Sequence, residues 1–220
     1  FIENNIIGTY NLLDDSLRYW EKLDISRKKS FKFIHISTDE VFGSLGFSGS
    51  FNEQSNYDPR SPYSASKASS DHLVNAWHHT YGLPTITTNC SNNFGPWQFP
   101  EKLIPVVITK ALKGEKIPLY GDGKNVRDWL FVDDHIEALK LIAYKGKLGE
   151  NYCIGGSNEK SNFDLIKEIC MNLDEIRPKS FPHLKLVSFV KDRLGHEIKM
   201  RGMPEGVRLI RSSKYAVSLA

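Results

Sequence analysis

The sequence predicts an α/β protein built on a doubly wound parallel sheet. The main observation is that amphipathic helical segments alternate with short β-rich runs, a pattern typical of parallel βα units. The composition agrees, because 40% hydrophobic and 25% charged residues lie close to the globular average. A chain of 220 residues is also long enough to bury a sizeable core. Disordered, collagen-like and coiled-coil classes are therefore disfavoured.

The first part of the chain is expected to form a helix, a connector and a strand. Residues 6–23 are predicted to be a helix because apolar residues recur at three- and four-residue steps. The apolar side of this helix is wider than one core contact needs. The basic run at residues 27–29 is expected to be a solvated turn, and the apolar, β-rich residues 31–37 should form a buried strand.

A loop, a second long helix and a second strand follow. Residues 43–61 are rich in Gly, Ser, Asn and Pro, which predicts a long loop. Ser61 or Ser64 could cap a helix that runs to about Tyr81, and residues 85–88 are the next predicted strand.

The second half of the chain shows fewer clear elements. The predicted elements are helices at 103–113, 133–144 and 163–173 and a strand at 151–154. Asp133 is the expected cap of its helix. From Arg177 onward the periodic pattern weakens.

Composition and motif content exclude several classes of function. The net charge of +3 is small and evenly spread, and no apolar run approaches the ~18 residues of a membrane span, so neither nucleic-acid nor membrane binding is expected. The three cysteines are far apart and form no CxxC motif, which argues against a disulfide framework or a zinc site and for a cytoplasmic location. The sequence has no GxGxxG turn and opens on a helix, so we expect the back half of a nucleotide-binding fold.

Tyr63 and Lys67 form the first candidate catalytic pair. Positions i and i+4 share one face of a helix. A phenol beside an ammonium has a lowered pKa, because the positive charge favours the phenolate, and such a Tyr can take a proton from an alcohol near neutral pH. The alternative is an amphipathic helix with an exposed Lys.

Thr38, Asp39 and Glu40 lie at the carboxyl end of the first predicted strand, where ligands bind in open α/β sheets. Adjacent carboxylates on a straight strand point to opposite faces, so both can reach one substrate only if the strand breaks into a turn. They can act as separate acid and base only if their environments split their pKa values. The alternative is a polar strand end.

Four stretches together resemble the extended short-chain dehydrogenase/reductase superfamily: HISTDEVFG, SPYSASKASSDHLV, TNCSNNFGP and RDWLFVDD. Within it, TDE with NCSNNFGPWQFPEKLIP and DRLGH resembles the dTDP-glucose 4,6-dehydratase family, and the similarity runs from Phe1 to about His196. The resemblance implies a partial Rossmann-type sheet with a smaller α/β substrate-binding region at the carboxyl end. We expect residues 1–95 to be the back half of an NAD-binding domain that carries the catalytic residues. Residues 96–220 should mainly bind the sugar nucleotide, with some return of the chain to the sheet.

Members of this family oxidise the C4 hydroxyl of a nucleotide sugar with NAD, eliminate water across C5 and C6, and return the hydride to C6. The resemblance implies that Tyr63 deprotonates the C4 hydroxyl, while Lys67 holds the nicotinamide ribose and lowers the pKa of Tyr63. Thr38 would hydrogen-bond near the C4 oxygen. Asp39 would protonate the departing hydroxyl, and Glu40 would remove the C5 proton. The implied NAD-binding residues are Ser37, Tyr63, Lys67 and Asn4.

The resemblance also implies a binding site for dTDP-glucose. Its residues would be Thr38, Asn92, Lys102, Leu103, Pro118, Tyr120, Arg127, Asn162, Arg193 and His196. Arg127 and Arg193 suit a diphosphate, because a planar guanidinium makes paired charge-assisted hydrogen bonds. No metal site is expected, since the histidines lack the spacing of a ligand set.

In this family the first helix and the YxxxK helix pack against their copies in a second subunit, so the resemblance implies a homodimer through residues 4–23 and 62–80. The alternative is that the whole apolar face of the first helix is buried under the sheet. The sequence also departs from the family pattern. Cys153 and Asn4 stand where Asn and Thr are usual, and the match degrades after His196. We expect the family's amino-terminal third to be missing, which would make the sequence a fragment or a truncated reading frame.

Two alternative functions stay open. One is another UDP- or CDP-sugar dehydratase, decarboxylase or epimerase of the same superfamily, although an epimerase has no use for the carboxylate pair. The other is a non-catalytic remnant that still binds a sugar nucleotide.

Overall fold

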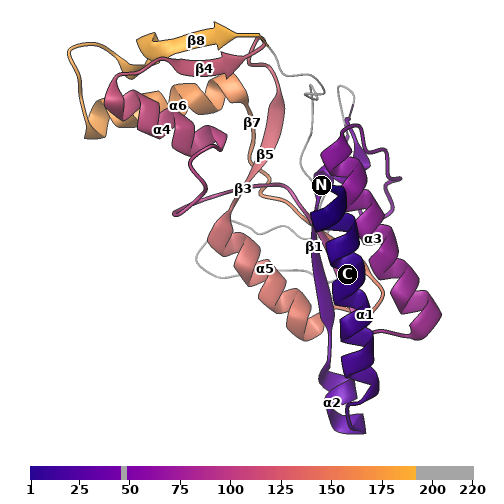
Figure 1. Ribbon diagram of the computed structural model, residues 1–220. Coiled ribbons are helices and arrows are strands. Elements are labelled where there is room, and N and C mark those ends of the chain that lie inside the picture. Colours follow the sequence, from indigo (N-terminus) through magenta and orange to yellow (C-terminus); the bar gives the residue numbers. More distant parts are fainter. Residues whose placement is uncertain (46–48, 192–220) are drawn as a thin grey trace.

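Figure 1 shows the protein as a computed structural model, which describes residues 1–45 and 49–191. The helices are α1 (Gly8–Glu21), α2 (Ile25–Ser30), α3 (Pro62–Tyr81), α4 (Leu103–Lys113), α5 (Val132–Lys145) and α6 (Asn162–Ile176). The strands are β1 (Phe33–Thr38), β2 (Thr85–Cys90), β3 (Asn92–Phe94), β4 (Ile117–Tyr120), β5 (Val126–Phe131), β6 (Asn151–Ile154), β7 (Glu159–Ser161) and β8 (Val187–Val190). Shorter helical turns are η1 (Ile2–Ile7), η2 (Asp39–Phe42) and η3 (His183–Leu186).

A parallel sheet in the order β1-β2-β6 confirms the predicted α/β class. Helices α1 and α3 cover one face of this sheet and α5 covers the other (Figure 1). Between α1 and α3, Leu13, Val74 and Leu83 form a buried cluster. On the opposite face, Ile142 of α5 packs in a cluster with Ile86 of β2 and other buried side chains. We call this part of the molecule the sheet lobe.

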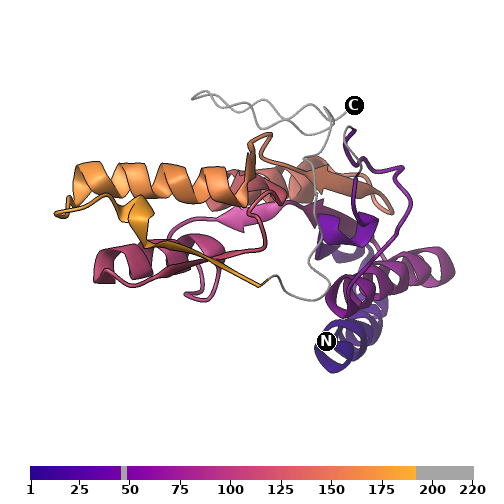
Figure 2. The ribbon, with the colours of Figure 1, turned by 90° about the horizontal axis from the view of Figure 1, so that it is seen from above.

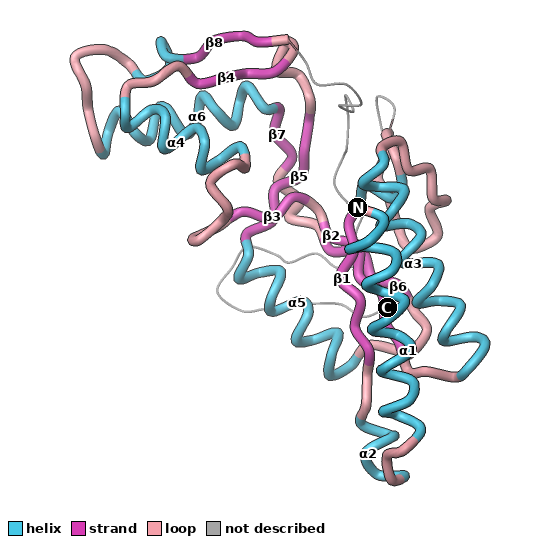
Figure 3. Tube along the Cα trace, viewed as in Figure 1, coloured by secondary structure: helices cyan, strands magenta, loops and turns pink. Residues whose placement is uncertain are grey.

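A second lobe consists of α4, α6 and the parallel pair β4–β8, and we call it the α4–α6 lobe. Its core is apolar and includes Val107, Leu119 and Ile166. Figures 1 and 2 place it at the opposite end of the molecule from α1 and α3. Strands β3, β5 and β7 lie between the two lobes (Figure 3). Among the described residues, no helix has both the length and the apolar character needed to cross a membrane.

Both ends of α3 have the expected signals. Ser61 is the cap, and its side chain accepts a hydrogen bond from the Ser64 backbone N–H at 3.0 Å. Ser64 returns the interaction, because its hydroxyl accepts from the Ser61 backbone N–H at 3.0 Å. The two candidate caps therefore act together as a capping box. Gly82 ends the helix with φ 69°, a left-handed conformation that suits glycine.

The amino-terminal part of the structure differs from the prediction in two places. The helical segment begins at Ile2 and not at residue 6, because the π-helix η1 precedes α1. The basic run at residues 27–29 lies in the short helix α2 rather than in a turn, because Asp24 accepts a hydrogen bond from the Arg27 backbone N–H at 3.0 Å and caps it.

Three further expectations about the elements were wrong or incomplete. Strand β1 was expected to be buried along its whole length, but its side chains differ in burial and Ile36 is 49% exposed. The cap of α5 is Phe131, which makes no side-chain cap bond, while Asp133 lies in the first turn. Strands β3, β4, β5, β7 and β8 were not predicted, since short runs of mixed polarity carry little periodic signal.

Replacing Ile142 by Ala should destabilise the sheet lobe. Ile142 is fully buried, so truncation removes apolar contacts and leaves a cavity, at a cost of about 2–5 kcal/mol. Ile136 lies on the same helix but is 44% exposed, and Ile136→Ala should change the free energy of unfolding by less than about 0.5 kcal/mol. Urea unfolding followed by circular dichroism measures both values, and equal effects would contradict the packing of α5 described above.

Candidate active site

Two adjacent cavities of about 420 Å³ each share lining residues from β3, β5 and the start of α4. We call the first the strand-end cavity, because it includes residues at the carboxyl ends of β1 and β2; it is lined by Ser37, Thr38, Glu40, Tyr63, Cys90, Ser91, Asn92, Asn93, Gln98, Phe99, Lys102, Leu103 and Trp129. We call the second the α4 cavity; it is lined by Asn92, Glu101, Lys102, Leu103, Val106, Lys110, Pro118, Tyr120, Arg127, Trp129 and Asn162. Four residues border both cavities, so the two form one continuous candidate site.

The turn that brings the two carboxylates together begins at Thr38. β1 ends there, and the Thr38 hydroxyl accepts a hydrogen bond from the Glu40 backbone N–H at 3.2 Å. Asp39 and Glu40 therefore lie in the 3-10 turn η2 and not on a straight strand, as their use by one substrate requires. Glu40 borders the strand-end cavity, whereas Asp39 is 3% exposed.

Asp39 has the electrostatic character of an acid. Its pKa is raised from 3.8 to about 7, first by burial and then by the negative charges of Glu40 and Asp128. The Arg127 guanidinium and a hydrogen bond from Thr38 lower the pKa by less. Asp39 can therefore hold a proton near neutral pH, where an ordinary carboxyl group is ionised.

Tyr63 and Lys67 lie one turn apart on α3. Burial raises the pKa of Tyr63 to about 12, and the nearby carboxyl groups, first that of Glu40, add to the rise. The pKa of Tyr63 is therefore raised and not lowered, contrary to the net direction expected from the spacing of Tyr63 and Lys67. The physical reason lies in the surroundings, because carboxylates face the phenol while the Lys67 ammonium donates to the Ile36 carbonyl at 2.9 Å.

Three of the four residues expected to bind NAD lie in the amino-terminal half of α3 and at the carboxyl end of β1. Ser37 and Tyr63 border the strand-end cavity. Lys67 is partly buried, and this burial lowers its pKa. Asn4 lies on η1, which is tied to α3 by a hydrogen bond from Asn5 Nδ2 to the Ser66 hydroxyl at 2.9 Å. A hydroxyl and a phenol beside a cavity at the strand ends, with an ammonium one turn further along α3, fit the sugar hydroxyls of the nicotinamide half of NAD.

The residues expected to bind the substrate gather around the α4 cavity. It is bordered by Asn92, Lys102, Leu103, Pro118, Tyr120, Arg127 and Asn162. Thr38 borders the strand-end cavity instead. The two remaining residues of this set, Arg193 and His196, lie outside the described residues. Lys102 and Arg127, with Lys110 added, make the α4 cavity rich in cations, which suits an anionic ligand.

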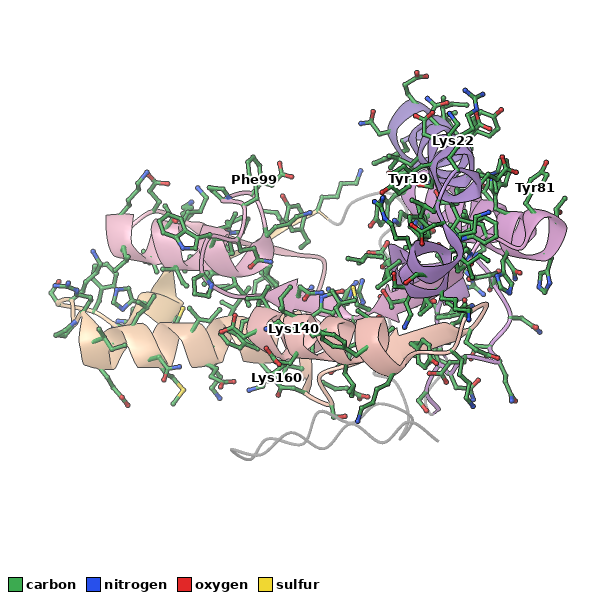
Figure 4. The ribbon with its side chains drawn as sticks, turned by 90° about the horizontal axis from the view of Figure 1, so that it is seen from below. Tyr19, Lys22, Tyr81, Phe99, Lys140 and Lys160 are labelled. Atoms are coloured by element: carbon green, nitrogen blue, oxygen red, sulfur yellow. The ribbon has the colours of Figure 1, made fainter. Side chains whose placement is uncertain are left out.

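The structure adds residues that sequence reasoning missed. Cys90, Gln98, Phe99 and Trp129 border the strand-end cavity. Phe99 is 65% exposed and projects from the loop before α4 (Figure 4). All four belong to stretches that carry the family resemblance, which was the available signal. Within residues 1–45 and 49–191, no group of three His, Cys, Asp or Glu side chains could hold a metal ion.

Comparison with known proteins gives consistent matches. Residues 1–208 match the family described as GDP-mannose 4,6 dehydratase. A dTDP-glucose 4,6-dehydratase from Xanthomonas campestris pv. campestris (strain B100) is 55% identical over 199 residues, which make up 90% of this chain and 57% of that protein.

Two solved structures share the fold. A dTDP-glucose 4,6-dehydratase from Bacillus anthracis, crystallised with NAD, has 45% identity and a TM-score of 0.79, over 91% of this chain and 58% of that one. A dTDP-glucose 4,6-dehydratase from Streptomyces venezuelae with NAD bound has 40% identity and a TM-score of 0.82, over 100% of this chain and 62% of that one. The chain thus spans less than two thirds of the length of these relatives.

The wild-type protein should become less stable as the pH rises, because the buried Asp39 carboxyl group loses its proton. Asp39→Asn should remove this pH dependence. The pKa of Asp39 is higher in the folded than in the unfolded protein, so folding binds this proton and stability falls between about pH 4 and pH 7. Each pKa unit corresponds to about 1.4 kcal/mol, so the wild type should lose a few kcal/mol relative to the variant over this range. Urea unfolding across the same range measures the difference.

The control for this experiment is Asp133→Asn, which removes a carboxylate at an exposed position of α5. Its pH dependence should follow that of the wild type. Parallel curves for Asp39→Asn and the wild type would contradict a raised pKa at Asp39.

Proposed function

The chain belongs to the GDP-mannose 4,6-dehydratase family, and from this membership we propose that it is the catalytic part of an NAD-dependent dTDP-glucose 4,6-dehydratase. The reaction would convert dTDP-glucose to dTDP-4-keto-6-deoxyglucose. The observation that carries the proposal is the Asp39–Glu40 turn beside Tyr63, with a buried acid of raised pKa and a second carboxylate at the cavity. Curated relatives of 55% identity are dTDP-glucose 4,6-dehydratases, which supports the same choice.

The first chemical step would use Tyr63, Lys67 and Thr38. Bound NAD would supply the hydride acceptor for C4 of the sugar and then the hydride donor for C6. Tyr63 would take the proton of the C4 hydroxyl, which requires that the cationic nicotinamide and the Lys67 ammonium offset the burial and the carboxylates that raise its pKa. Thr38 would hold that oxygen by a hydrogen bond. Lys67 lies one turn from Tyr63 and contributes a positive charge and a hydrogen-bond donor for the nicotinamide ribose, with Ser37 and Asn4 as further contacts.

The elimination step would use the carboxylate pair. Once C4 is a ketone, the C5 proton is α to a carbonyl and far more acidic. Glu40 takes this proton, and Asp39 gives its own proton to the departing C6 hydroxyl, which leaves as water. Two neighbouring carboxyl groups can share this work only when one is protonated and the other ionised, and the raised pKa of Asp39 supports that division.

The α4 cavity would hold the nucleotide. Arg127 and Lys102 would bind the diphosphate, while Tyr120, Pro118 and Asn162 would border the nucleoside. Arg193 and His196 are proposed for the same site on the resemblance alone. The functional division would then follow the expected one, with residues 1–95 bearing the catalytic groups and residues 96–220 mainly the substrate contacts.

A related nucleotide-sugar epimerase, decarboxylase or dehydratase is the main alternative. The Asp39–Glu40 turn favours a dehydratase, because interconversion at C4 needs no acid–base pair for loss of water. A product scan with dTDP-, UDP- and CDP-glucose separates these activities. NAD binding by the purified protein separates an enzyme from a non-catalytic remnant.

Tyr63→Phe should block the first step, and Asp39→Asn with Glu40→Gln should block only the second. Loss of a general acid or base costs roughly 100-fold or more in kcat. The double variant should still oxidise C4 but release little 4-keto-6-deoxy product, which mass spectrometry of the reaction measures. Tyr81→Phe, at a 51% exposed position near the end of the same helix, is the control and should keep wild-type activity. Product release at the wild-type rate by the double variant would make the role assignment wrong.

We also propose a homodimer through residues 4–23 and 62–80. In support, α1 exposes large apolar side chains: Tyr10 (45%), Leu12 (62%) and Tyr19 (51%). Figure 4 shows Tyr19 and Tyr81 on the α1–α3 side, away from the α4–α6 lobe. Leu12 and Tyr19 are seven residues apart and so share one face of α1, and an exposed apolar face on a helix is typical of a protein–protein contact. A cytoplasmic location is proposed as well, and the free cysteines Cys90, Cys153 and Cys170 agree with a reducing compartment.

Leu12→Arg should dissociate the dimer, because a buried unpaired guanidinium is strongly unfavourable in an apolar contact. Ile176→Arg is the control, since Ile176 is 71% exposed at the end of α6 in the other lobe. Light scattering of the two variants should give a monomer mass for the first and a dimer mass for the second. A wild type that is monomeric at all accessible concentrations would refute the interface.

A further inference from the structure

Asp71 is a buried carboxylate on α3 that the proposed reaction does not use. Its side chain is 1% exposed and makes four hydrogen bonds. His35 Nε2 lies 3.0 Å from Oδ1. The other oxygen, Oδ2, accepts from Ser37 Oγ at 3.0 Å, Tyr57 Oη at 3.1 Å and Asn89 Nδ2 at 3.0 Å. A carboxylate is tolerated in such a place when its lone pairs are satisfied, and here the donors come from β1, β2 and the loop before α3.

The network reaches the turn that holds the catalytic carboxylates. Asn89 Nδ2 donates to the Thr38 carbonyl at 3.2 Å as well as to Asp71. Ser37 directly precedes Thr38 in the chain. Asp71 is therefore connected by two short routes to the backbone from which η2 begins, although it lies on a different element.

A second hydrogen bond links α3 to β1, one helical turn before Asp71. Lys67 Nζ donates to the Ile36 carbonyl at 2.9 Å, next to the residue that Asp71 holds. Tyr63, Lys67 and Asp71 are spaced by four residues and so lie along one face of the helix. The two anchors fix how far α3 can slide along β1, and with it the position of Tyr63 relative to the Thr38–Glu40 turn.

We propose that Asp71 is a positioning residue whose hydrogen bonds hold the carboxyl end of β1 against α3, so that Tyr63 and the Thr38–Glu40 turn keep their mutual geometry. The kinetic consequence rests on the proposed function, whereas the structural consequence does not. The charge of Asp71 also supports the second anchor. Burial lowers the pKa of Lys67, whereas the negative charge of Asp71 raises it and so favours the ammonium form that donates to the Ile36 carbonyl.

The test compares two variants that each remove one partner of Asp71. Asn89→Ala removes the donor that links Asp71 to the Thr38 carbonyl and changes no residue of α3 or β1. Tyr57→Phe removes a hydrogen bond on the loop side, keeps the ring that stacks on Phe42, and leaves β1 untouched. Both are compared with the wild type in the full-length protein, by amide hydrogen exchange of residues 33–42 and by steady-state kinetics with dTDP-glucose.

Asn89→Ala should speed amide exchange in residues 33–42 by about tenfold or more, because the end of β1 loses an anchor. Its kcat should fall by about tenfold or more while KM stays within about threefold, since misplaced reacting groups slow chemistry without removing substrate contacts. Tyr57→Phe should stay within about twofold of the wild type in exchange and kcat. Asp71→Asn should increase amide exchange and lower kcat by more than Asn89→Ala does. If Asp71→Asn does not fold, the result for Asn89→Ala alone tests the proposal.

Two results would overturn the proposal. One is unchanged exchange and kcat in Asn89→Ala. The other is a loss of kcat that is equal in Asn89→Ala and Tyr57→Phe, or a loss in each variant that is proportional to its loss of thermal stability. A purely structural role would give either pattern. A wild type without dehydratase activity would refute the proposed function instead, and the exchange data alone would then decide whether Asp71 positions the turn.

Discussion

The parallel pairing of β1 with β2 is the constraint on which the candidate site depends. The register sets Ser37 beside Asn89 and Thr38 beside Cys90, so both strands end at the same level. The chain then turns away on each side, into η2 after β1 and toward β3 after β2. A shift of one residue would turn every side chain of β1 to the other face, and Ser37 would no longer reach Asp71.

Asp39 shows how position in the fold makes two neighbouring carboxyl groups chemically different. Both come from the same short turn, yet one is buried close to Asp128 and the other borders a cavity. The negative charge of Glu40 adds to the effect of burial on Asp39. Asp128 is itself held in place, because it accepts hydrogen bonds from the backbone N–H groups of Gly156 and Asn158 at 2.7 Å each. The loop after β6 thereby influences the acid through a fixed charge.

The parts that sequence reasoning predicted well are those with a local physical cause. Helix α4 matches its predicted bounds, and α3 begins at its Ser61 cap and ends at Gly82. The grouping of the α4-cavity residues followed from the family resemblance and would not have followed from periodicity, because they come from separate elements. The pKa of Tyr63 was predicted in the wrong direction, since spacing along one helix gives the position of Lys67 but not the carboxylates that β1 and its turn bring to the phenol. Asp71 was missed for the same reason, because its partners are distant in the chain.

The wall that the two cavities share limits how the specificity of such a protein can diverge. A substitution at Asn92, Lys102 or Trp129 changes the lining of both cavities together. Lys110 and Tyr120, by contrast, border the α4 cavity alone. Under the proposed function, natural variation or library design that seeks a different base would therefore be least disruptive on the later turns of α4 and on β4, while the common wall would keep the sugar in register with the catalytic groups.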